Sequence, residues 1–73
     1  MGKIPPLSYL DVCKILVAHG FVKVRQRGSH IVMQKEVGDS TVTVPVPCHK
    51  ELKLGTLHSI IRQSGIPKSE FES

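Results

Sequence analysis

The chain has 73 residues, 40% of them hydrophobic and 22% charged, with a formal net charge of +4. This composition is typical of a folded protein and not of a disordered tail, so we expect a single domain over residues 1–73. No apolar run approaches the ~20 residues of a membrane span, and no signal peptide is recognisable. We therefore expect a cytoplasmic protein that does not enter a membrane.

The first predicted element is a helix over residues 8–19. Ser8 and Asp11 have the spacing of a capping box, and Gly20 stands where a left-handed residue commonly ends a helix. The expected buried stripe comes from apolar residues at helical spacing, which are Tyr9, Leu10, Cys13, Leu16 and Val17.

From Phe21 onward the apolar period changes to two, which indicates β-strands. In the first strand the alternation places Val22 and Val24 inward and a basic row, Lys23, Arg25 and Arg27, outward. Gly28-Ser29 predicts a turn, after which a second strand starts near His30 with Ile31 and Met33 inward. A register slip of one residue at this turn would instead point His30 toward the core.

A second turn is predicted at Gly38-Asp39, followed by a strand with Val42, Val44 and Val46 inward. Pro45 and Pro47 indicate either an edge position in the sheet or the end of the strand. A second helix follows, with an apolar stripe, an exposed His58 and Arg62, and Gly65 at its end. The stripe consists of Leu54, Leu57, Ile60 and Ile61, and Phe71 is expected to dock on the core after a further helical turn.

The predicted order is helix, three strands, helix, which indicates an α+β fold. A three-stranded antiparallel sheet with one apolar face needs a cover, and two amphipathic helices on that face provide it. The other face of the sheet then lies in water. Its predicted occupants are Lys23, Arg25, Arg27, His30, Gln34, Thr41 and Thr43.

The strongest functional signal is the run Arg25-Gln26-Arg27-Gly28-Ser29-His30. Guanidinium groups suited to phosphate lie there beside an imidazole, the side chain that moves protons near neutral pH. An isolated histidine is more often a surface residue, and a basic strand is often only solvated. The preceding Gly-Ser pair and the shared face favour a site for a nucleic-acid backbone.

Other chemistries find less support. Cys48-His49 has no second ligand pair at zinc spacing, and two cysteines do not make a disulfide framework. No phosphate-cradling glycine loop is present, so nucleotide-dependent reactions are disfavoured. We therefore expect neither a metal nor a cofactor. His49 is equally consistent with a loop residue and with a second group that transfers protons or contacts phosphate.

An ordered set of motifs resembles the HicA family, and the resemblance covers nearly the whole chain. The motifs are Gly20-Phe21-Val22, the run ending at His30, Val44-Pro45-Val46-Pro47-Cys48-His49, Leu54-Gly55-Thr56-Leu57 and Ile60-Ile61-Arg62-Gln63-Ser64-Gly65-Ile66. HicA proteins are small toxins of type II toxin–antitoxin pairs with a double-stranded-RNA-binding-domain-like fold. They act as mRNA interferases, and a HicB-type antitoxin neutralises them by covering the active site.

The resemblance implies roles for individual residues. The family's catalytic histidine corresponds to His30, and Gly28 and Ser29 match the two residues before it. The family's proline-x-histidine motif corresponds to Pro47 and His49, so Ser29 and His49 are expected to support catalysis. The expected RNA contacts are Lys23, Arg25, Arg27, Gly28, Lys50 and Lys53.

Two questions stay open at this point. One histidine cannot easily serve both ends of the cleaved bond, so His49, a lysine or water must fill the second role. The rival function is a non-catalytic double-stranded-RNA-binding or adaptor module, whose phosphate contacts would come from the second helix and the loop before it. Those contacts would be Lys50, Lys53, His58 and Arg62.

Overall fold

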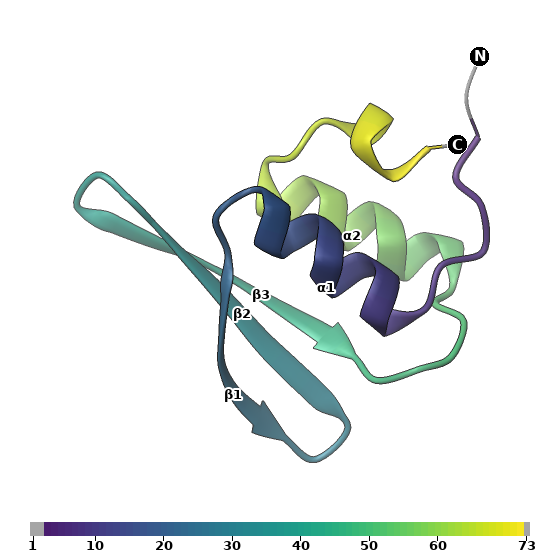
Figure 1. The fold of residues 1–73 in the computed structure, drawn as a ribbon, viewed down its shortest axis with the longest axis horizontal. Coiled ribbons are helices and arrows are strands. Elements are labelled where there is room, and N and C mark those ends of the chain that lie inside the picture. The colour runs from purple at the N-terminus through teal and green to yellow at the C-terminus, as the bar shows by residue number, and fades with distance from the viewer. Residues whose placement is uncertain (1–2, 73) are drawn as a thin grey trace.

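The computed structural model describes residues 3–72, and its elements follow the predicted order (Figure 1). They are α1 Tyr9–Ala18, β1 Val22–Arg27, β2 His30–Val37, β3 Ser40–Pro47, α2 Leu54–Ser64 and a 3-10 helix, η1, Lys68–Phe71. The three strands form an antiparallel sheet in the order β1-β2-β3. This is the α+β arrangement of a double-stranded-RNA-binding-domain-like fold, as predicted.

The start of α1 is held by the predicted capping box. The backbone N–H of Asp11 donates to Ser8 Oγ at 3.2 Å, and the backbone N–H of Ser8 donates to Asp11 Oδ2 at 3.0 Å. These bonds satisfy two donors that the helix itself leaves unpaired. They also lower the pKa of Asp11, chiefly through the backbone N–H of Ser8 and next through its hydroxyl.

The end of α1 is a Schellman motif. Gly20 adopts a φ of +94°, which lets its own N–H reach the carbonyl of Val17 at 3.1 Å. The N–H of Phe21 bonds the carbonyl of Leu16 at 3.0 Å, and both of these side chains are buried. The motif therefore ends the helix and brings Phe21 into the core in one step.

The buried face of α1 differs from the prediction. Val12 and Leu16 are fully buried, whereas Leu10 and Val17 are 57% and 58% exposed. Tyr9, Cys13 and Ile15 are half-buried beside the core. Apolar residues surround most of this helix, so periodicity alone could not decide which stripe faces inward.

In β2 and β3, buried and outward side chains alternate as predicted. Ile31, Met33, Val44 and Val46 are buried, and Val42 packs partly against the same cluster. β3 lies at an edge of the sheet, one of the two placements that its prolines indicated. The face opposite the core, which we call the open face, carries the outward residues of all three strands.

β1 forms as predicted with Arg25 and Arg27 outward, but the predicted placement of its first three residues is wrong, because a β-bulge interrupts the alternation. Lys23 pairs with Met33 and Arg25 pairs with Val32, so Val24 is an extra residue between them. Lys23 is thereby placed on the helix-facing side of the sheet, while Val22 is placed on the open face opposite Gln34. Neither Val22 nor Val24 enters the core; they are 59% and 43% exposed.

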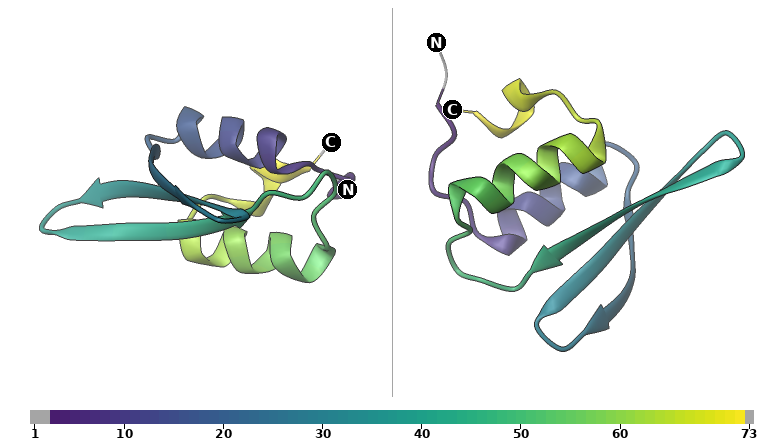
Figure 2. Two further views of the ribbon diagram at one scale, coloured as in Figure 1. Left: turned by 90° about the horizontal axis from the view of Figure 1, so that it is seen from below. Right: turned by 180° about the vertical axis from the view of Figure 1, so that it is seen from behind.

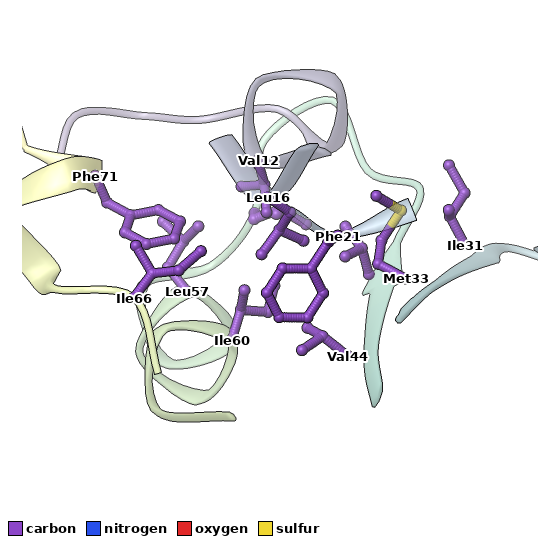
Figure 3. Close-up of a cluster of buried hydrophobic side chains, with 12 residues drawn as sticks. Val12, Leu16, Phe21, Ile31, Met33, Val44, Leu57, Ile60, Ile66 and Phe71 are labelled. Atoms are coloured by element: carbon purple, nitrogen blue, oxygen red, sulfur yellow. The ribbon is translucent and has the colours of Figure 1, made fainter. Parts of the chain in front are cut away.

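The core fills the space between α1, α2 and the sheet (Figure 3). Leu57 and Ile60 of α2 are buried in it, whereas Leu54, predicted inward, is 56% exposed. Gly65 ends α2 with a φ of +72°. Ile66 and Phe71 then close the cluster from the C-terminal side, which confirms the docking of Phe71 (Figure 3).

The β2–β3 hairpin is longer than the rest of the sheet. β1 pairs with β2 only as far as Val22 opposite Gln34, but β2 and β3 stay paired to Val37 opposite Ser40. Residues 35–42 therefore form a two-stranded arm that projects away from both helices (Figures 1 and 2). Within residues 3–72, no helix has the length and apolar character needed to cross a membrane.

Candidate active site

The turn between β1 and β2 sets the position of His30. Gly28 adopts a φ of +55°, the left-handed region that glycine enters without steric cost. Arg27 and His30 then pair directly across the turn, and His30 also pairs with Pro47 of β3. His30 is exposed, so the register slip that would have buried it does not occur.

His30 lies among cations on the open face. Side chains of directly opposed residues in a sheet start about 4.5–5.5 Å apart, so Arg27 is the immediate neighbour of His30. Arg25, opposite Val32, is next along the same face of β1. Both arginines are exposed. The ion pairs found among residues 3–72, His19–Glu70 at 3.1 Å and Lys68–Glu72 at 4.0 Å, use neither guanidinium group.

Backbone hydrogen bonds tie the segment after β3 to the same end of the sheet. The N–H of Cys48 donates to the carbonyl of Ser29 at 2.6 Å, and the N–H of His49 donates to the carbonyl of Pro47 at 2.9 Å. The carbonyl of His49 accepts from the N–H of Tyr9 at 3.1 Å. His49 is exposed and directly follows Cys48, the residue that is bonded to Ser29. We call this end of the sheet, with the Gly28-Ser29 turn and residues 47–49, the turn end.

Lysines extend the positive charge beyond the turn end. Lys50 follows His49 directly, and Lys53 occupies the N-cap position of α2 without a side-chain capping bond. Both are exposed, while Leu52 between them is buried and anchors the loop. The loop is also held by the N–H of Leu52, which donates to the carbonyl of Leu7 at 2.8 Å.

Lys23, predicted beside Arg25 and Arg27, is separated from them by the bulge. Its Nζ donates to Gln26 Oε1 at 3.5 Å, and Gln26 pairs with the inward residue Ile31. Its charge acts on Cys13 of α1, where it opposes the rise in the thiol pKa caused by burial and, secondarily, by the neighbouring Cys48. Lys23 therefore belongs to the helix-facing side of β1.

Sequence reasoning missed a groove at the base of the arm, beside the edge where β1 stops pairing with β2. It has a volume of about 420 Å³, and we call it the β1 groove. It is lined by Gly20, Val22, Val24, Gln34, Lys35, Glu36 and Thr41. The bulge creates it by turning the two valines out of the core, and no pattern in the β1 sequence announces a bulge.

The remaining outward residues lie where the alternation placed them. Thr41 and Thr43 are exposed, and Gln34 Nε2 donates to Thr43 Oγ1 at 3.3 Å. Across residues 3–72, no three His, Cys, Asp or Glu side chains gather as a metal site would require.

Comparison with known families gives a match over most of the chain. The family model described as the HicA toxin of bacterial toxin–antitoxin systems matches residues 10–66, which include all three strands, α2 and all of α1 except its first residue. No curated protein matches the chain significantly.

Proposed function

We propose, from the premise that this chain belongs to the HicA toxin family of bacterial toxin–antitoxin systems, that it is an endoribonuclease acting on mRNA. The observation that carries the proposal is the pairing of an exposed His30 with Arg27 on the open face. A phosphodiester lying on Arg25 and Arg27 would have its ribose within reach of the His30 imidazole.

RNA supplies its own nucleophile, so the reaction needs no metal. The 2′-oxygen attacks phosphorus while a base removes its proton, and the 5′-oxygen leaves as an acid protonates it. The products are a 2′,3′-cyclic phosphate and a 5′-hydroxyl. His30 serves as the general base or acid, an effect worth about 10²–10⁴-fold in rate. Arg27 and Arg25 stabilise the negative charge that develops on the phosphoryl oxygens.

The second proton-transfer group is proposed to be His49. The Cys48–Ser29 and Tyr9–His49 backbone bonds support this choice, because they hold the segment of His49 beside the start of β2. Lys50, the next residue, and water are the alternatives. A bell-shaped pH dependence of cleavage that loses one limb in His49→Ala would support His49, and an unchanged profile would assign the role elsewhere.

A toxin of this family works with an antitoxin. We propose that a HicB-type antitoxin neutralises this chain by covering the turn end, where it would shield His30 and the two arginines from RNA. The proposed place of action is the cytoplasm, where the mRNA is.

The second candidate function is non-catalytic binding of double-stranded RNA. Lys50, Lys53, His58 and Arg62 are exposed along the loop before α2 and on α2 itself, which gives that reading a set of phosphate contacts. A binding module would retain RNA without producing fragments. Cleavage therefore separates the two functions.

The test compares His30→Ala with His58→Ala on a single-stranded transcript in the presence of a chelator. His58 is the matched control, because it is an exposed histidine on α2. We expect His30→Ala to lose at least about 10²-fold in cleavage rate while keeping its melting temperature, and His58→Ala to cleave normally. Equal cleavage by His30→Ala, or fragments without cyclic phosphate ends, would refute the mechanism.

A further inference from the structure

Part of the lining of the β1 groove lies on the same face of the sheet as His30, namely Val22, Gln34, Glu36 and Thr41. Outward positions alternate along β2, so His30, Val32, Gln34 and Glu36 share the open face. Gln34 is about 13 Å from His30 along the strand, at ~3.3 Å per residue. A strand of RNA cleaved at His30 and continuing across the open face would therefore reach the groove a few nucleotides from the cleaved bond.

The chemistry of the groove differs from that of the turn end. Its walls include the exposed aliphatic side chains of Val22 and Val24, on which the flat face of a base can rest. Its rim carries the Glu36 carboxylate, which repels a phosphate and accepts hydrogen bonds from N–H donors. The groove thus suits a base edge and not the RNA backbone.

The donors and acceptors of the groove select among the four bases. An ionised carboxylate can accept two parallel hydrogen bonds. Guanine presents two adjacent donors, N1–H and the N2 amino group, whereas adenine, cytosine and uracil place an acceptor beside each donor on that edge. Lys35 lines the groove from the other side of β2, because it pairs with the inward residue Val42.

Two contacts hold the groove in shape. Gln34 Nε2 donates to Thr43 Oγ1 at 3.3 Å, which orients the amide and leaves its carbonyl oxygen without a role in this bond. The Lys35 Nζ lies 5.9 Å from the centroid of the Phe21 ring, and a Cβ built on Gly20 would come within 3.3 Å of Lys35 Cε. Lys35 is thus confined between Phe21 and Gly20 at one wall of the groove.

We propose that the β1 groove binds a guanine base of the RNA substrate and so sets the sequence preference of cleavage, with Glu36 as the residue that reads it. The proposal rests on the proposed ribonuclease function. The turn end then holds the RNA backbone, and the β1 groove identifies the base. This is the usual division between contacts that position a nucleic acid and contacts that specify its sequence.

The first test maps cleavage sites on a transcript of random sequence. For the wild type we expect guanine to be enriched at one fixed position away from the cleaved bond. Glu36→Gln should lose about tenfold of this preference while it continues to cleave. Asp39→Asn is the matched control, because it removes a carboxylate from the tip of the same hairpin outside the groove. No enrichment in the wild type, or enrichment retained in Glu36→Gln, would overturn the proposal.

The second test does not depend on cleavage. In His30→Ala, guanosine monophosphate should shift the backbone NMR signals of Val22, Gln34 and Thr41, and the adenosine, cytidine and uridine monophosphates should shift them much less. Equal shifts with all four nucleotides, or none, would overturn the groove proposal.

A wild type that cleaves no RNA but binds guanosine monophosphate in the groove would instead refute the ribonuclease function alone. If the groove seats the antitoxin, Glu36→Gln would weaken neutralisation and leave cleavage preference intact, which would also overturn it.

Discussion

The sheet has two contrasting ends: the turn end, and the opposite end, where the arm begins and which we call the arm end. The two ends differ in how they are built. At the turn end, Gly28 shapes the turn, and the backbone hydrogen bond from Cys48 to Ser29 ties the end of β3 to it. The backbone that carries the cations is therefore held on both sides. At the arm end, β1 has stopped pairing and only β2 and β3 continue. The arginines and the histidine therefore lie where the backbone is most constrained, while the less supported end carries two valines, polar side chains and the carboxylate of Glu36.

The largest effect on RNA binding is expected when the two arginines near the turn end are replaced. Arg25→Gln together with Arg27→Gln should weaken RNA binding by about tenfold or more, since hydrogen bonds to charged groups contribute ~1.5–3 kcal/mol each. Each lost phosphate contact should also flatten the salt dependence of binding by about 0.7 in slope. Binding measured over a salt series checks both.

Arg62→Gln is the control for the arginine pair, because it removes an exposed guanidinium from α2 and none from the open face. It should leave both the affinity and the salt slope close to those of the wild type. A loss from Arg62→Gln as large as from the pair would move the RNA surface to α2 and favour the double-stranded-RNA-binding alternative.

A smaller effect should come from the two turn glycines, one at each end. Gly28 and Gly38 have φ values of +55° and +60°, and a Cβ at either would meet nothing within 4 Å. Gly28→Ala and Gly38→Ala should therefore each cost about 1–2 kcal/mol of backbone strain, measured as the free energy of unfolding in urea. Only Gly28→Ala should also slow RNA cleavage, because only that turn positions His30. Equal loss of cleavage from both would show that the two ends are not independent.

The smallest effect concerns the capping box, which starts α1 next to the turn end through the Tyr9–His49 bond. The pKa of Asp11 is lowered in the folded protein, so its ionised form stabilises the fold. That contribution is present above the unfolded pKa and is lost as pH falls through the lower folded pKa. Unfolding of wild type and Asp11→Asn, compared over this pH range, should differ at neutral pH and converge in acid. A difference that persists in acid would contradict the assignment.

Much of the fold follows from short-range signals in the sequence. Ser8 with Asp11, Gly20, Gly28 and Gly65 each act through bonds or φ angles within a few residues, so their roles can be predicted locally. The alternation of buried and exposed residues along β2 and β3 could also be predicted from the sequence, because one face of each strand packs on the core.

The errors occur where local pattern and tertiary packing disagree. Apolar and basic residues alternate from Val22 to Arg25, yet a bulge moves Lys23 to the helix-facing side and exposes both valines. In α1, apolar residues on several faces left the orientation to be settled by contacts with β3 and η1. Both choices depend on segments distant in the chain.

The sequence by itself determined the order of elements, their caps and turns, and a cationic strand leading to His30, because each of these depends on neighbours along the chain. Only the tertiary structure decided that Ser29 and Cys48 meet at the turn end, that Lys23 is separated from Arg25, and that a groove opens at the base of the arm. The reason is physical: strand register and bulges are set by packing between segments far apart in sequence, which local propensity does not encode.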